Sequence, residues 1–112
     1  MNDHMWHKVC TIEELEENWG EVALIEGRQY AIFRLTGDRI FATDHADPNS
    51  GALVIARGIT GQKGDVPTIA SPLYKEEYDL RTGESLNSDF HLPVYETRIE
   101  KSEVLISVPV SS

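Results

Sequence analysis

Apolar and polar residues alternate in short runs along most of the chain, which is a pattern typical of β-strands. The run over residues 29–35 differs, because apolar residues occupy both of its faces. Tyr30 and Ile32 fall on one face, and Ala31 and Phe33 fall on the other. A strand that is apolar on both faces is covered on both sides, so this run predicts a central strand.

Turn signals separate this strand from its neighbours. Thr36-Gly37-Asp38-Arg39 and Arg81-Thr82-Gly83-Glu84 predict hairpin turns, and Lys101-Ser102 predicts a third. Proline at position 67 sits near the beginning of a further apolar run, where a missing amide donor does least harm. The other strands are expected over residues 6–10, 22–25, 40–43, 66–70, 77–80, 85–86, 92–100 and 104–110.

One helical signal interrupts the β pattern. Thr11 and Glu14 have the spacing of a capping box, in which the two residues exchange bonds between side chain and backbone at a helix start. Gly20 could supply the left-handed residue that ends such a helix. The sequence therefore predicts one short helix between Thr11 and Gly20.

These elements together indicate an all-β protein. Short strands with turn signals every ~8–12 residues favour an antiparallel β sandwich or a partly open barrel. A chain of 112 residues is the size of one domain, so we expect a single domain over 1–112, ordered over about 5–110.

Composition and charge narrow the possible partners and the compartment. Ten basic and nineteen acidic residues give a formal net charge of −9, which disfavours nucleic acid and anionic membrane surfaces as partners. No apolar run approaches the ~20 residues of a membrane helix, and the N-terminus has no signal-peptide pattern. Cys10 is the one cysteine; we expect a buried, inert thiol and a cytoplasmic protein.

Two loops carry the remaining candidate chemistry, the first over residues 44–51 and the second over residues 70–83. His45 could titrate near neutrality, but a loop histidine bonded to backbone or water is the more economical interpretation. Asp44 and Asp47 are carboxylates of a turn-forming loop rather than an evident acid–base pair. Ser71 lacks an adjacent base that would activate it as a nucleophile. We therefore predict no catalytic residue and no metal ligand.

The two loops resemble those of Rieske [2Fe–2S] proteins, which bind iron through Cys-x-His in one loop and Cys-x-x-His in another. Aligned on that pattern, the ligand positions fall on Asp47, Asn49, Ser71 and Tyr74. The flanking Pro48 and Pro72 fit the pattern, as does Tyr78. The cluster requires cysteine thiolates, which these positions do not provide. The resemblance therefore implies a Rieske-like fold with vestigial cluster positions and no cofactor of its own.

Nearly the whole chain, roughly residues 5–108, resembles the small subunit of NAD(P)H-dependent assimilatory nitrite reductase. The resemblance implies a large-subunit partner that carries FAD, siroheme and an iron–sulfur cluster and reduces nitrite to ammonium. It further implies that this chain supports the large subunit and has no activity of its own. The residues that carry the resemblance are 6–10, 30–34, 41–43, Asp47-Pro48, Arg57-Gly58-Ile59 and 71–75.

Cationic and rigid residues near the vestigial positions are candidates for contact with that partner. Arg57, Pro72, Tyr74 and Lys75 form this set. The alternative is that Arg57 and Lys75 only pair with nearby acids such as Glu76 and Glu77. Two other functions stay open for the whole chain: a Rieske-type ferredoxin that carries electrons, and a free-standing β module that binds an unrelated protein.

Overall fold

Ten strands and two 3₁₀ helices make up the part of the chain that the computed structural model describes, residues 4–73 and 75–109. All named strand pairs are antiparallel. The strands are β1 His4–Thr11, β2 Trp19–Ile25, β3 Arg28–Leu35, β4 Arg39–Asp44, β5 Ile59–Lys63, β6 Val66–Ala70, β7 Glu77–Asp79, β8 Val94–Tyr95, β9 Thr97–Glu100 and β10 Glu103–Pro109, and the helices are η1 Ile12–Glu14 and η2 Ile55–Arg57.

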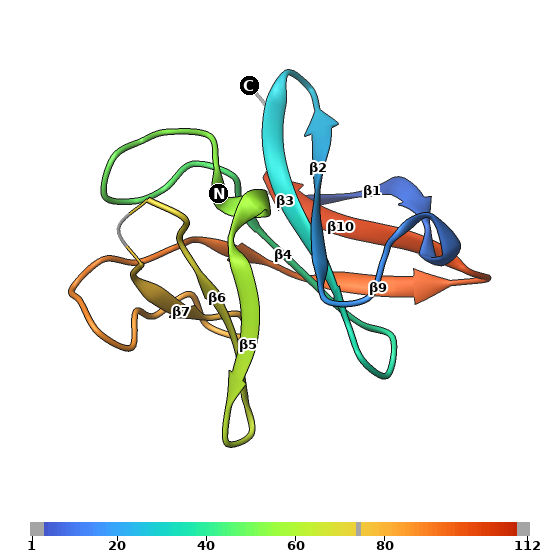
Figure 1. Ribbon diagram of the computed structural model, residues 1–112. Coiled ribbons are helices and arrows are strands. Elements are labelled where there is room, and N and C mark those ends of the chain that lie inside the picture. The colour runs from blue at the N-terminus through green and yellow to red at the C-terminus, as the bar shows by residue number, and fades with distance from the viewer. Residues whose placement is uncertain (1–3, 74, 110–112) are drawn as a thin grey trace.

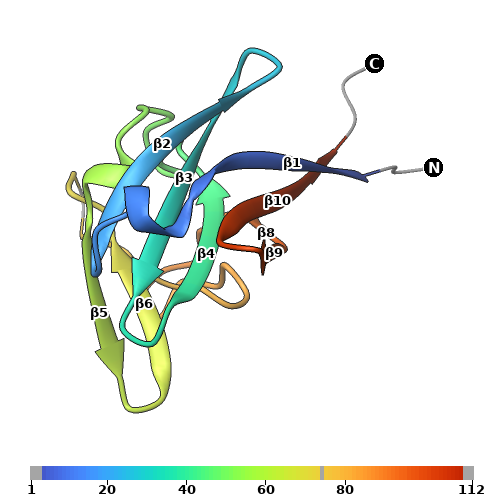
Figure 2. The same ribbon diagram turned by 90° about the vertical axis from the view of Figure 1, so that its right-hand side faces the viewer.

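The strands form three sheets, in the orders β1-β10-β9, β2-β3-β4-β8 and β5-β6-β7. The four-stranded sheet lies between the other two, with β5–β7 on one side and β1, β9 and β10 on the other (Figure 1). The second view shows the same order from the side (Figure 2). The predicted all-β antiparallel fold is confirmed, and none of the sheets in the described residues closes into a barrel.

The central position of β3 explains its two apolar faces. Tyr30 and Ile32 belong to a first core, which also contains Val104 and Ile106 of β10. Ala31 and Phe33 belong, with Leu35, to a second core that includes Ile55, Ile69 and Tyr78. One strand thus contributes to both cores because successive side chains point to opposite faces. The first core joins the four-stranded sheet to β10, and the second joins it to β6, β7 and η2.

Most predicted strands are confirmed, and two need correction. The run over 85–86 forms no strand, because Ser85 makes only an isolated bridge to Tyr78. The run over 92–100 was expected to be a single strand of the last hairpin. Instead, β8 pairs with β4, and β9 pairs with β10 after the chain passes Glu96. The backbone of Glu96 accepts a hydrogen bond from the amide of Ser107 at 2.9 Å, so the chain changes sheets at this residue. The hairpin through Lys101-Ser102 is confirmed.

The predicted helix between Thr11 and Gly20 is wrong beyond its first turn. The amide of Thr11 does donate to the Glu14 carboxylate at 2.8 Å, but only the 3₁₀ turn η1 forms. Isolated helices this short are unstable, and pairing with β3 draws the following residues into β2. Asn18, with φ 60°, takes the left-handed conformation that had been expected at Gly20.

Gly20 has a packing role instead. A Cβ atom at this position would lie 2.3 Å from the carbonyl oxygen of Ala56 and 2.7 Å from the Phe33 ring. Only glycine lets η2 approach β2 this closely. This contact holds η2, which follows the first loop, against β2 of the four-stranded sheet.

Neither helix in the described part of the chain is long and apolar enough to cross a membrane.

Candidate functional site: two loops joined by a polar network

The first loop leaves β4 and turns around a buried carboxylate. Asp47 is 1% exposed, and its Oδ1 accepts the amide of Asn49 at 2.9 Å. Its backbone amide donates to the carbonyl of Ala52 at 2.8 Å, and its carbonyl accepts the amide of Gly51 at 2.7 Å. A side chain that bonds to the backbone two residues ahead is an Asx turn, so the sequence stabilises this loop locally.

The second loop leaves β6 and closes on itself at Ser71. The amide of Ser71 donates to the carbonyl of Glu76 at 2.9 Å, and its carbonyl accepts the amide of Lys75 at 3.1 Å. Its hydroxyl accepts a longer bond, 3.3 Å, from the amide of Leu73. Lys75 takes a left-handed conformation with φ 62°, which completes the turn. Both loops are therefore closed by their own backbone before they meet.

Two side-chain hydrogen bonds join the loops. The Ser71 hydroxyl donates to Asp47 Oδ2 at 2.7 Å, and Asn49 Nδ2 donates to Glu76 Oε1 at 2.7 Å. Ser71 is 2% exposed and Glu76 is 7% exposed, so both bonds are shielded from water. We call these four residues, Asp47, Asn49, Ser71 and Glu76, the inter-loop network.

Three of the four residues that the sequence aligned with iron ligands thus lie together. Asp47, Asn49 and Ser71 belong to the network, while Tyr74 lies outside the described residues. Glu76 was not predicted as a network residue, because the sequence indicated only an acid that could pair with the nearby cations. The sequence signal is that Glu76 directly precedes the predicted strand 77–80. A side chain at that position can point back between the two loops.

A buried phenol lies beside the network. Tyr78 is fully buried in the second core, and its hydroxyl and Glu76 Oε2 have no hydrogen-bond partner among the described residues. Burial, followed by the nearby carboxylates of Glu76 and Asp47, raises the pKa of Tyr78 to about 12. Two orphan polar atoms therefore lie next to the closed loops, which is unusual for a protein interior.

The donor atoms of the network do not fit a [2Fe–2S] cluster. Such a cluster needs cysteine thiolates, and the network offers carboxylate, amide and hydroxyl groups that already bond to one another. Within the described residues, no three His, Cys, Asp or Glu side chains gather as a metal site. Cys10 lies on β1 against the first core; it is partly exposed rather than buried, and burial followed by Glu14 and Glu21 raises its pKa.

The other titratable residues of the first loop have structural partners. His45 is 4% exposed, and its Nδ1 accepts the amide of Ala56 at 3.1 Å, which confirms the prediction of a histidine bonded to backbone. Burial, and then the charge of Arg57, lower its pKa. Asp44 does not pair with Asp47, because it accepts from Arg28 at 3.1 Å and from the Tyr95 hydroxyl at 2.6 Å.

The described candidate contact residues lie at the end of η2 and on the second loop. Arg57, Pro72 and Lys75 are exposed. Neither Arg57 nor Lys75 forms an ion pair with a described residue. Glu76 accepts a hydrogen bond from Asn49, and Glu77 pairs with Lys63 at 2.7 Å. The interpretation that local acids neutralise Arg57 and Lys75 is therefore wrong for the described acids.

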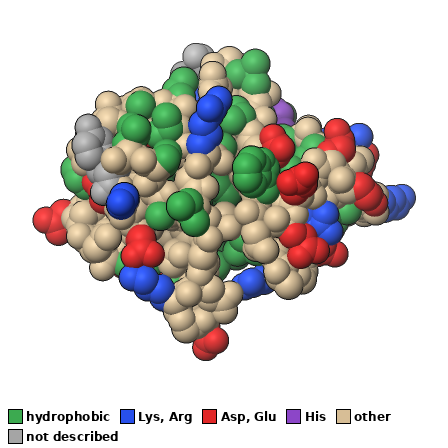
Figure 3. Space-filling model, viewed as in Figure 1, with side chains coloured by type: hydrophobic (Ala, Val, Ile, Leu, Met, Phe, Trp, Pro, Cys, Tyr) green, Lys and Arg blue, Asp and Glu red, His purple; other side chains and the backbone are tan. Residues whose placement is uncertain are grey.

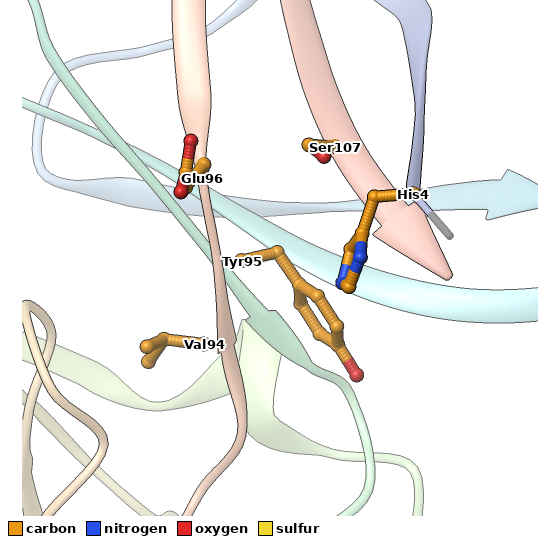
Figure 4. Close-up of a pocket in the computed structure, with 5 residues that line it drawn as sticks. All are labelled: His4, Val94, Tyr95, Glu96 and Ser107. Atoms are coloured by element: carbon orange, nitrogen blue, oxygen red, sulfur yellow. The ribbon is translucent and has the colours of Figure 1, made fainter. Parts of the chain in front are cut away.

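A hollow of about 320 Å³ lies elsewhere, against β8 and the beginning of β1. Its lining includes His4 and Tyr95, whose side chains face one another (Figure 4). The hydroxyl of Tyr95 is engaged by Asp44 at 2.6 Å, and the hollow shares no residue with the inter-loop network.

Comparisons with known proteins agree with this geometry. A sequence model of the family "Rieske-like [2Fe-2S] domain" matches residues 5–107. The nitrite reductase (NADH) small subunit of Salmonella typhimurium is 32% identical over 101 residues, which cover 88% of this chain and 94% of that protein. The crystal structure of a proposed NADH-dependent nitrite reductase small subunit from Mycobacterium tuberculosis has a TM-score of 0.89 at 30% identity, covering 97% and 98% of the two chains.

A longer protein also contains a similar segment. Part of the nitrite reductase [NAD(P)H] large subunit of Klebsiella oxytoca is 38% identical over 78 residues. The match covers 70% of this chain but only 8% of that protein. A domain like this one therefore occurs there within the large-subunit polypeptide.

Proposed function

Because the chain belongs to the Rieske-like [2Fe-2S] domain family, among its nitrite reductase small subunits, we propose that it is the cofactor-free small subunit of an assimilatory nitrite reductase. The partner is the large subunit, which reduces nitrite to ammonium with NADH or NADPH. In this proposal FAD, siroheme and the iron–sulfur cluster belong to the large subunit, and the assembly is cytoplasmic. This chain supports that subunit and contributes no catalytic residue.

The observation that carries the proposal is the inter-loop network. Where a cluster-binding relative needs thiolate and imidazole, this chain has Asp47, Asn49 and Ser71, already bonded within the protein. The loops therefore have a means of closure that requires no metal. A rigid, closed end of a β protein suits a binding surface better than an electron carrier.

Reconstitution tests the cofactor-free role against the ferredoxin alternative. Purified chain is treated with iron and sulfide under reducing conditions, desalted, and measured by visible absorbance and by iron and labile-sulfide analysis. We expect no visible band and no stoichiometric iron. Stoichiometric iron and sulfide with a visible band would contradict the proposal and favour the electron carrier.

The second part of the proposal is that the exposed end of the loops contacts the large subunit. Arg57, Pro72 and Lys75 are exposed there, and the two cations have no described acidic partner. Tyr74 remains a candidate contact that lies outside the described residues. Unpaired cations on a chain of net charge −9 suit an acidic patch on the partner.

Co-purification with a tagged large subunit tests the contact. The double variant Arg57→Glu with Lys75→Glu should lose co-purification, because charge reversal turns attraction into repulsion. Lys101→Glu is the matched control, since Lys101 is exposed in the β9–β10 turn, away from the loops. Unchanged recovery of the double variant would remove these contacts from the proposal. Failure of the unmodified chain to co-purify would remove the small-subunit function and leave the free-standing module.

A further inference from the structure

Large apolar side chains are exposed where β2 and β5 begin, on the face that leads to the loops. Ile59 is 75% exposed and Trp19 is 59% exposed, and on the loops Leu53 is 52% and Leu73 is 47% exposed. In the space-filling view, hydrophobic side chains gather over the loops and the upper part of β5, and acidic side chains are most numerous on the right, over β1, β9 and β10 (Figure 3). We call Trp19, Leu53, Ile59 and Leu73, with Arg57 among them, the apolar face.

Tertiary contacts hold these residues on one surface. The Thr60 hydroxyl donates to the carbonyl of Asn18 at 3.2 Å. Trp19 follows Asn18 in the chain and Ile59 precedes Thr60, so Trp19 and Ile59 lie near each other. Ile59 pairs with Ala70, the last residue of β6 before the second loop. Ile59 therefore lies at the end of β5 that adjoins the second loop, and β2 contacts η2, the helix that carries Arg57.

We propose that the apolar face is the docking surface for the large subunit, with Trp19 and Ile59 as the exposed anchors that the partner covers and Arg57 as a charged contact. This inference rests on the proposed function and deepens it. The partner surface it requires is apolar at its centre and carries a carboxylate opposite Arg57. Trp and Arg at the centre of an apolar patch are typical of residues that dominate binding energy.

A second exposed tryptophan shows why this face is the better candidate. Trp6 on β1 is 36% exposed, but the guanidinium of Arg98 covers its ring at 4.2 Å. No described cation stacks on Trp19. The chain thus covers one tryptophan with its own side chain and leaves the other open. An open aromatic ring on β2, near the unpaired cation Arg57 of η2, favours a partner that supplies apolar area and negative charge.

The large subunit is the occupant we commit to, for two reasons. A segment similar to this chain lies within the large-subunit polypeptide of Klebsiella oxytoca, so the two parts occur there as one protein. In addition, the face includes Arg57 of η2 and Leu73, the neighbour of Pro72 in the second loop, so it adjoins the proposed contact residues. A surface that extends from these residues can bury apolar area on the same partner.

The experiment measures binding of the purified chain to the immobilised large subunit. We expect Ile59→Asp and Trp19→Ser each to weaken the affinity about tenfold or more, as loss of a central anchor does. Ile59→Thr keeps the branched shape suited to a strand and should also weaken binding, so it covers the case in which Ile59→Asp folds poorly. Ile99→Asp is the matched control, since Ile99 is 41% exposed on β9, outside the face.

Each outcome decides something different. If thermal unfolding shows folded variants that bind like the unmodified chain, the docking surface is wrong and the small-subunit function is untouched. Equal loss in Ile99→Asp would also contradict it, because the effect would not be local. If the unmodified chain does not bind at all, the proposed function itself fails. A concentration-dependent dimer that Ile59→Asp abolishes, with binding to the large subunit unchanged, would assign the face to a second copy of the chain.

Discussion

The first core and the inter-loop network are two solutions to the same problem of holding distant segments together. The first core joins β3 to β10 through side chains such as Ile32 and Ile106, which are almost completely buried. The network joins two loops through hydrogen bonds between four polar side chains. Apolar contacts depend on area and tolerate exchange, whereas buried hydrogen bonds depend on the geometry of each atom. The closed conformation of the loops therefore depends on the positions of individual polar atoms.

The largest expected effect lies in the first core. Ile106→Ala removes a fully buried side chain and leaves a cavity between β10 and the central sheet. We expect the free energy of unfolding to fall by about 4 kcal/mol, measured by chemical denaturation. Unfolding should stay cooperative, because the core belongs to the whole protein. A loss below about 1 kcal/mol would show that the site collapses around the smaller side chain.

The next effect lies in the network and would come from a single carboxylate. Asp47→Ala leaves the Ser71 hydroxyl and the Asn49 amide without their acceptor. We expect a loss of about 3 kcal/mol in unfolding free energy, with faster amide hydrogen exchange confined to the two loops.

Asp65→Ala is the control for that variant, because Asp65 is exposed in the turn between β5 and β6. A double-mutant cycle with Ser71→Ala isolates the energy of the bond between the two side chains. A coupling energy of zero would mean that the bond does not hold the loops together.

A third effect depends on pH, through the buried phenol. The pKa of Tyr78 is raised to about 12, so the neutral form stabilises the fold fully below the unfolded pKa of about 10. As the pH rises above about 10, the free energy of unfolding falls, and the loss reaches about 2 kcal/mol at pH 12. Tyr78→Phe should remove this part of the alkaline destabilisation, measured as the difference between the two proteins in denaturation at a series of pH values.

Tyr95, changed by the same substitution (Tyr95→Phe), is the control for this titration. Its pKa is also raised, by burial and by its hydrogen bond to Asp44, but it lies away from the network. Near neutral pH, Tyr78→Phe should be neutral or slightly stabilising, because the hydroxyl has no described partner. A clear loss of stability at pH 7 would show that the hydroxyl has a partner after all.

The smallest effect is expected on the outer surface of the loops. Arg57→Ser removes an exposed cation that forms no ion pair with a described residue, so the unfolding free energy should change by less than about 0.5 kcal/mol. The pKa of His45 should rise, because Arg57 is one of the causes that lower it. An NMR titration of the imidazole measures this shift. An unchanged pKa would show that the two side chains do not interact.

The sequence by itself determined the strand pattern and the absence of cluster ligands. Alternation with period two is a local property, so β3, β4, β6 and the last hairpin were predictable from their own residues. The identity of Asp47, Asn49 and Ser71 is likewise enough to exclude thiolate chemistry at these positions.

The tertiary structure alone decided how these residues are used. The residues after Glu14 became a strand rather than a helix because β3 offered them pairing partners. Glu76 became a network residue because Asn49, distant in sequence, meets it in space. Trp19 and Ile59 lie near each other because a hydrogen bond from Thr60 to Asn18 joins β5 to the residue before β2. Contacts between distant segments depend on how the sheets pack, and no local pattern encodes that packing.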